Sequence, residues 1–236
     1  MTHFMKSIVL LVVSLVLFGC VRIETEPTPT PLVSLKEVLT FSQFDQGDFQ
    51  DLRFASQPNH LLDMDQMVET DAKTIKKLSF KNLSVGDETQ IILMPNTRVK
   101  ITAFGLELPS NQQQQSHLFV DHNSLHSKSA FRVKTQYITV TPLGTKYSVK
   151  AHQQNFSIDV FEGSTQLTSN TQSWQPQLVK KHENGVARGQ NRPETQPIAT
   201  TELAKLIHPI TQLERVKLTQ LPTPKPLYPC HRLHLW

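Results

Sequence analysis

Apolar and polar residues alternate in short runs through the middle of the chain, from Gly86 to residue 168. β-branched and aromatic residues are frequent in these runs, which suits strands. A period of two buries one face of a strand and leaves the other in solvent. The pattern predicts eight strands: Thr89–Leu93, Arg98–Ala103, His117–Val120, Ala130–Thr135, Tyr137–Thr141, Thr145–Ala151, Asn155–Phe161 and Ser164–Thr168. No long helical pattern interrupts them, so we expect an all-β sandwich, roll or β-helix-like stack.

Residues typical of turns separate the predicted strands. We expect turns at Pro95-Asn96, Asp121–Asn123, Leu143-Gly144 and Glu162-Gly163. Glycine tolerates positive φ and a close backbone neighbour, which other residues do not. Gly144 and Gly163 are therefore predicted to have one of these two features.

The segments on either side give weaker signals. Residues 35–84 are expected to form the amino-terminal part of the body; in them Ser34–Leu39 fits either a helical turn or a strand, and Thr70–Leu78 alternates weakly. Residues 193–236 are expected to form a helical strap on the β body and a Pro-rich tail. A helix over Thr201–His208 should end or kink at Pro209, before a second amphipathic stretch, and four prolines after Leu221 favour an extended chain.

The amino terminus has the organisation of a secretion signal. Lys6 precedes an apolar run from Ile8 to Phe18, and Gly19-Cys20 follows. Eleven helical residues reach about 16 Å, roughly half of the ~30 Å hydrocarbon layer, so the run is too short for a membrane span. Residues 1–19 are therefore predicted to be a cleaved signal peptide.

Leu17 to Cys20 resembles the bacterial lipobox, which implies acyl chains, palmitate included, on Cys20. Two or three acyl chains bind a membrane durably. Val21 in place of Asp favours sorting to the outer membrane in Gram-negative bacteria, so we expect the protein at its periplasmic face. Residues 20–34 are rich in Pro and Thr and form the expected tether. Lipid on Cys20 leaves Cys230 without a disulfide partner in the chain.

Composition argues against a nucleic-acid partner. The formal net charge is +4, from 24 Lys and Arg against 20 Asp and Glu, and the basic residues are spread along the chain. A focused basic stripe, which nucleic-acid binding requires, is absent from the sequence.

Several segments resemble the FecR domain in order and spacing. They are Gly86–Leu93, Thr97–Ile101, Phe131–Thr135, Val140–Val149 and Ile158–Leu167. The most diagnostic pieces are the Gly144-Thr145-x-Tyr147 run and the later Glu162-Gly163 pair, which we take as the structural motif. The resemblance covers residues 85–192 and implies a FecR-like β domain.

The same resemblance implies a signalling context, with one departure. FecR-type regulators resemble one another in having a cytoplasmic anti-sigma segment, an uncleaved membrane helix, the periplasmic β domain and a part that contacts an outer-membrane iron transporter. A cleaved signal and a lipid anchor at Cys20 leave no cytoplasmic segment, so the resemblance extends to the domain and not to the whole pathway.

The motifs of common enzymes are missing from the sequence. A nucleophile elbow, a His-Glu-x-x-His helix and a phosphate-binding glycine loop do not occur. His117, Asp121, His122 and His126 could collect a metal, but a turn at His122 favours solvated side chains instead. Glu162 has no second carboxylate nearby in sequence and is assigned a structural role. We expect no enzyme activity, no metal and no cofactor.

Aromatic side chains could stack on sugars or on a partner. Tyr147 and Phe161 lie in alternating runs and are expected in the core. The sequence does not decide whether Tyr137 is buried, and Trp174 suits the surface or a cap equally.

Two functions are compatible with these features. The favoured one is a lipid-anchored envelope protein whose β domain binds an envelope protein or a polysaccharide as a binding or scaffold module. The alternative is a regulatory partner in trans-envelope signalling of the iron-transport type.

Overall fold

The computed structural model describes residues 31–45, 47–56, 60–82, 87–109, 115–123 and 131–219. The signal peptide, Cys20, His126 and the tail with Cys230 lie outside these residues. Strands dominate the described part, and one helix, α2 (Thr200–Thr219), closes it. The expected all-β class with a helical strap is confirmed. Within the described residues, no helix has both the length and the apolar character needed to cross a membrane.

The amino-terminal region, which the sequence left open, consists of strands. Ser34–Leu39 lies in a strand and not in a helical turn. The elements are β1 (Leu32–Thr40), β2 (Gln43–Asp45), β3 (Asp48–Gln50), β4 (Arg53–Ser56), β5 (His60–Leu62), β6 (Met67–Glu69) and β7 (Thr74–Asn82).

The next strands follow the predicted runs, except for β10, which the sequence did not predict. They are β8 (Asp87–Leu93), β9 (Arg98–Thr102), β10 (Gly105–Glu107), β11 (Gln115–Asn123) and β12 (Arg132–Lys134). The expected turn at Asp121–Asn123 is wrong, because these residues continue β11. They pair with β8, and His122 also pairs with Thr145 on the other side. Hydrogen bonding on both edges keeps the segment extended despite its turn-forming residues.

Two strands of 15 residues each form the longest hairpin, β13 (Ile138–His152) and β14 (Asn155–Ser169). The sequence predicted four strands here, with turns at Leu143-Gly144 and Glu162-Gly163. Those turns are wrong: each glycine lies inside a long strand, and the register of the pair shifts between Leu143 and Tyr147.

Gly144 and Gly163 make the irregularity possible. Both have positive φ, 66° and 71°, as predicted. A Cβ on Gly163 would lie 2.0 Å from the backbone oxygen of Gly144, a distance that no side chain tolerates. The two glycines thus form a β-bulge that bends the hairpin without ending its ladder.

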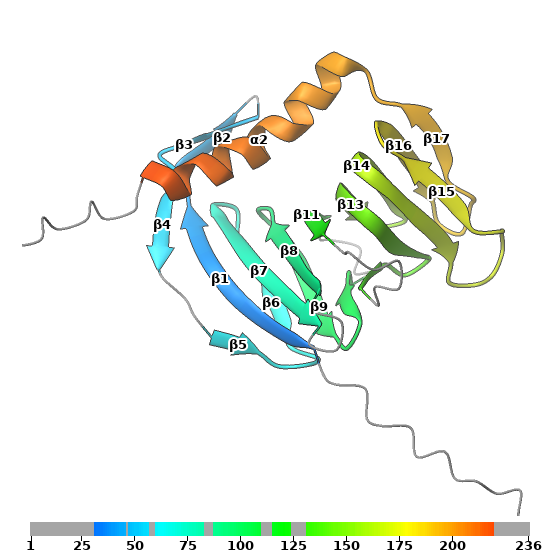
Figure 1. Cartoon of the computed structure of the whole chain (residues 1–236), viewed down its shortest axis with the longest axis horizontal. Coiled ribbons are helices and arrows are strands. Elements are labelled where there is room, and N and C mark those ends of the chain that lie inside the picture. Colours follow the sequence, from blue (N-terminus) through cyan, green and yellow to red (C-terminus); the bar gives the residue numbers. More distant parts are fainter. Residues whose placement is uncertain are drawn as a thin grey trace, which may run out of the picture.

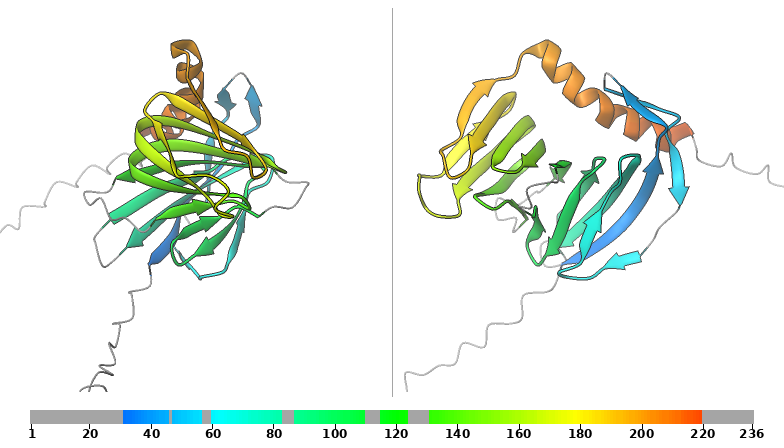
Figure 2. Two further views of the ribbon diagram at one scale, coloured as in Figure 1. Left: turned by 90° about the vertical axis from the view of Figure 1, so that its right-hand side faces the viewer. Right: turned by 180° about the vertical axis from the view of Figure 1, so that it is seen from behind.

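The bend lets one hairpin belong to two layers. The carboxy-terminal half of β13 pairs with β11, whereas its amino-terminal half pairs with β12. The fifteen-stranded sheet therefore runs in the order β4-β1-β7-β8-β11-β13-β12-β10-β9-β6 and curls back on itself (Figures 1 and 2). Strands β15 (Gln177–Lys180), β16 (Glu183–Arg188) and β17 (Glu194–Pro197) extend it beyond β14.

The main core fills the space between the two layers. Leu78, Ile91 and Leu118 come from one layer, and Ile101 and Val133 come from the other. All five side chains are fully shielded from solvent. Alternation along each strand places these residues on the inner face, which is why the periodic pattern predicted the class correctly.

A second core lies on the opposite face of the β1-β7-β8-β11 layer, beneath α2. Leu39, Ile75, Phe119 and Phe161 of the sheet pack there with Leu213 of the helix. The helix spans the concave side of the curled sheet, from the end of β17 to the β2–β3 hairpin (Figure 1). The strap expected at the carboxy terminus therefore packs on the β body.

The helix does not end at Pro209, one of the two outcomes expected there, because α2 continues through this residue. Proline removes the N–H that would bond the carbonyl of Lys205. The β2–β3 hairpin packs on the helix here: Gly47 lies against that carbonyl, and Gln212 exchanges two hydrogen bonds of 2.8 Å with the backbone of Phe49. Tertiary contacts of this kind offset the cost of the proline.

Replacement of Gly163 by alanine tests the bulge. Gly163→Ala should lower the free energy of unfolding by about 3 kcal/mol or more, because positive-φ strain of ~1–2 kcal/mol adds to displacement of the Gly144 backbone. Urea denaturation followed by circular dichroism measures the change.

Gly189→Ala is the matched control. Gly189 also has positive φ, but its nearest neighbour to an added Cβ is a side-chain oxygen at 3.7 Å. Its replacement should cost only the strain, about 1–2 kcal/mol. Equal losses in the two variants would contradict the close approach as the cause.

Candidate functional site

The residues of the sequence motif lie at the bulge and in the core. The Thr145 hydroxyl donates to the carbonyl of Ser164 and accepts from the Leu143 N–H at 3.1 Å. Tyr147 is completely buried, and burial raises the pKa of its phenol. Glu162 is exposed, with its carboxylate 3.7 Å from the Lys146 ammonium. Four of the motif residues thus shape the hairpin, and Glu162 alone faces a surface where a partner could bind.

The residues weighed as metal ligands do not converge. His122 is buried, with Nδ1 2.7 Å from the Thr89 hydroxyl and its ring stacked on Phe131. Asp121 lies on the opposite face of the same strand, because neighbours in a strand alternate. The expectation that His122 sits in a turn is wrong. Across the residues that the structure describes, no group of three His, Cys, Asp or Glu side chains could hold a metal ion.

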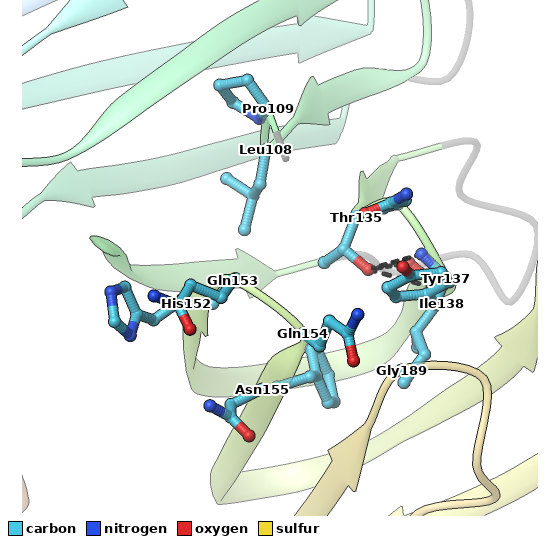
Figure 3. A pocket seen from close by; sticks show the side chains of 13 residues that line it. Leu108, Pro109, Thr135, Tyr137, Ile138, His152, Gln153, Gln154, Asn155 and Gly189 are labelled. Carbon is cyan, nitrogen blue, oxygen red and sulfur yellow. Dashed lines mark hydrogen bonds between the residues drawn. The ribbon is translucent and has the colours of Figure 1, made fainter. Parts of the chain in front are cut away.

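One small pocket lies between the β13–β14 turn and the segment before β13 (Figure 3). Its volume of about 20 Å³ has room for roughly one water molecule. Leu108, Tyr137 and Gln154 line it, among others. A pocket of this size does not hold a substrate or cofactor.

A much larger groove lies between the concave face of the sheet and α2. Its volume is about 740 Å³, within the range of ligand sites in proteins. Strands β1, β7, β8, β11, β13 and β14 form the floor, and α2 forms the wall. The lining side chains are Lys36, Glu37, Lys77, Glu88, Gln90, Ile91, Ile92, Phe119, Val120, Asp121, Lys146, Tyr147, Phe161, Glu162, Ile207, Ile210, Thr211 and Glu214.

One part of the groove is apolar. Ile92 and Phe119 from the floor and Phe161 from β14 meet Ile207 and Ile210 from the helix. Phe119 and Phe161 stack with their ring centroids 6.1 Å apart. The two phenylalanines are buried, so the half-buried Ile92, Ile207 and Ile210 supply the apolar surface that is open to a ligand.

Several charged side chains of the floor are paired across strands. Lys146 lies 3.7 Å from both Asp121 and Glu162, so one ammonium serves two carboxylates. Glu88 accepts from Ser79 at 2.6 Å, which together with Lys81 holds the pKa of Glu88 below its usual range. The lining as a whole contains five carboxylates and three ammonium groups. Its balance is acidic, in a chain whose formal net charge is +4.

An ion pair fixes the helix to the floor. Lys77 lies 2.8 Å from Glu37, and both side chains are only 14 % exposed. The Lys77 ammonium also donates to the backbone carbonyl of Leu213 at 3.3 Å. The width of the groove is thus set by a charged contact as well as by the apolar core under α2.

The comparisons with known proteins identify the floor of this groove. Residues 70–166 match the family model described as FecR protein. The chain contains a FecR domain. The motifs predicted a domain over residues 85–192, whereas the match starts earlier, at residue 70, and ends earlier, at residue 166. It spans β7 to most of β14. The FecR domain therefore supplies the groove floor from β7 to β14, whereas β1 and α2 lie outside the match.

Two solved structures are also similar to this chain. Both are crystal structures of "a putative anti-sigma factor from Parabacteroides distasonis ATCC 8503". The first is 14% identical, covers 64% of this chain and 75% of its own, and has a TM-score of 0.43. The second is 14% identical, with 59% and 62% covered and a TM-score of 0.40. No curated protein matches the chain.

Sequence reasoning missed the groove. Its charged residues occupy the solvent-facing positions of the alternating strands, where the pattern predicts only polarity. Its wall comes from α2, which begins 31 residues after the end of β14, the last strand of the floor. The acidic and apolar residues of Ile207–Glu214 were the available signal, since an amphipathic helix covers some surface.

Two histidines make the fold sensitive to acid. Burial, helped by Lys150, lowers the pKa of His117 to about 3, and its Nε2 has no hydrogen-bond partner among the described residues. Burial also lowers the pKa of His122. The unfolded chain binds these protons below about pH 6.5. Below this pH the unfolded chain therefore binds more protons than the folded chain. Protonation favours unfolding, so the free energy of unfolding falls as the pH falls below 7.

We expect the free energy of unfolding to fall on the order of 2 kcal/mol from pH 7 to pH 5 through His117 alone. His117→Leu, which cannot be protonated, should show a smaller loss in urea titrations at the two pH values. His152→Leu is the control, because His152 is exposed on the end of β13. The same pH dependence in both variants would show that His117 is not the cause.

Proposed function

We propose that this chain is a regulatory partner in signal transduction across the cell envelope, and that its FecR domain binds a protein partner in the groove beneath α2. Strands within the FecR match form most of the groove floor, and this placement is the main support for the proposal. A family of regulatory proteins and an open groove on the same strands point to recognition of another protein.

The lining of the groove supports a protein partner. Apolar side chains and charged pairs lie side by side, which is the composition of a protein interface with an apolar centre and a polar rim. Lys146 and Glu162 are 47 % and 61 % exposed, so a partner can exchange this ion pair for its own at little cost.

The position of the domain follows from the amino terminus. We propose that acyl chains on Cys20 hold the protein at the periplasmic face of the outer membrane, with the Pro/Thr-rich tether as a spacer. In this arrangement a separate membrane protein carries the signal inward.

A lipid-anchored scaffold that binds an envelope protein is the second candidate, and the same groove supports it. A polysaccharide ligand has less support, because three of the aromatic rings that the sequence suggested for stacking are covered. Tyr147 and Phe161 are buried, and Trp174 packs on the core with its indole N–H bonded to the Gln190 carbonyl at 3.1 Å.

Transcript levels distinguish signalling from a scaffold role. Deletion of the gene in its native host should change the transcripts of a defined gene set several-fold, and the wild-type chain should restore them. A chain with Asp121→Lys and Glu162→Lys should not, because both substitutions repel a partner that suits the acidic floor.

The control carries Asp65→Lys and Glu69→Lys. These carboxylates are also exposed and each is ion-paired, but they lie at β6 in the other layer. The control should restore the transcripts. Unchanged transcripts after deletion, with an envelope protein still cross-linked to the wild-type chain and lost in Cys20→Ser, would overturn the signalling role and favour the scaffold.

A further inference from the structure

We propose that the groove beneath α2 binds the chain's own carboxy-terminal segment, residues 221–236. This inference rests on the groove and on the sequence after α2, and it does not depend on the signalling role. It names an occupant for the groove that a partner would have to displace.

The segment begins near the groove and is long enough to run along it. Glu214 lines the groove, and α2 ends five residues later, at Thr219. Five helical residues cover about 8 Å, so the chain leaves the helix close to one end of the groove. The groove follows α2 back to Ile207, about 18 Å from Thr219. Eleven further residues, to Cys230, reach up to about 36 Å, which is enough to run back along the whole groove.

The charge of the segment is opposite to that of the groove lining. Residues 221–236 include Lys225 and Arg232 and contain no Asp or Glu. The groove lining has five carboxylates against three ammonium groups, and Asp121 and Glu162 share a single lysine at 3.7 Å. A second cation placed between these carboxylates would relieve their incomplete neutralisation.

The segment and the groove both present apolar side chains. The segment carries Leu227, Tyr228, Leu233, Leu235 and Trp236. The groove presents the half-buried side chains of Ile92, Ile207 and Ile210, which these residues would cover. Four prolines restrict the segment before it binds, which reduces the conformational entropy lost on docking.

Attachment to α2 favours this occupant over a free peptide. A short connection gives an effective concentration in the millimolar range, so even weak contacts fill the groove. A protein partner then has to compete with the segment, which makes the groove available only to ligands above a certain affinity.

Disulfide trapping tests the proposal with the cysteine that the segment already contains. In the full chain with Cys20→Ser, Gln90→Cys places a thiol on the groove floor, where it can meet Cys230. Lys134→Cys is the matched control, an exposed strand position of the opposite layer. Mild oxidation should produce an intramolecular 90–230 disulfide at least about tenfold faster than a 134–230 disulfide. Non-reducing electrophoresis and peptide mass spectrometry identify the products.

Charge reversal supplies a second measurement. Asp121→Lys with Glu162→Lys should slow formation of the 90–230 disulfide several-fold, whereas Asp65→Lys with Glu69→Lys should leave it unchanged; circular dichroism verifies that each variant is folded. Equal rates for the two cysteine positions would overturn the proposal. Disulfide-linked dimers in place of the intramolecular product would assign the groove to a second copy instead.

Discussion

The fold depends on one close approach between backbones, at the bulge where Gly163 lies against Gly144. An ordinary side chain at Gly163 would collide with the neighbouring strand. Without the bulge, β13 and β14 would form a straight hairpin belonging to one layer. With it, the two halves of β13 pair with different neighbours, β11 on one side and β12 on the other. The two layers of the sheet, and the core enclosed between them, follow from that change of partner.

The curvature that encloses the core also creates the groove. The face of the sheet opposite the main core is concave, and the one helix in the described part of the chain spans it (Figure 1). Apolar packing around Leu213 and the contacts of Lys77 with Glu37 and the helix backbone hold α2 in place. The helix covers part of the face and leaves the acidic part open. The FecR domain thus presents a surface that α2 covers only in part.

Polar groups at the groove and in the core differ in their surroundings. On the groove floor, Lys146 is paired with Asp121 and Glu162. In the core, His122 bonds Thr89 through Nδ1, while its Nε2 and the Tyr147 hydroxyl have no partner among the described residues. Burial keeps the His122 ring and the Tyr147 phenol neutral, because a buried charge without a partner is costly.

The all-β class, most strand positions from β8 to β14, the FecR resemblance and the special backbone role of Gly144 and Gly163 could all be predicted from the amino-acid sequence. These properties are local, since alternation and glycine backbone freedom act within a few residues. The sequence did not determine that Leu143-Gly144 and Glu162-Gly163 continue strands, that Asp121–Asn123 extend β11, or that α2 passes through Pro209. In each case hydrogen bonds or packing from distant segments outweigh the local preference. The groove was decided by tertiary structure alone, because its floor and wall come from segments that only the curled sheet brings together.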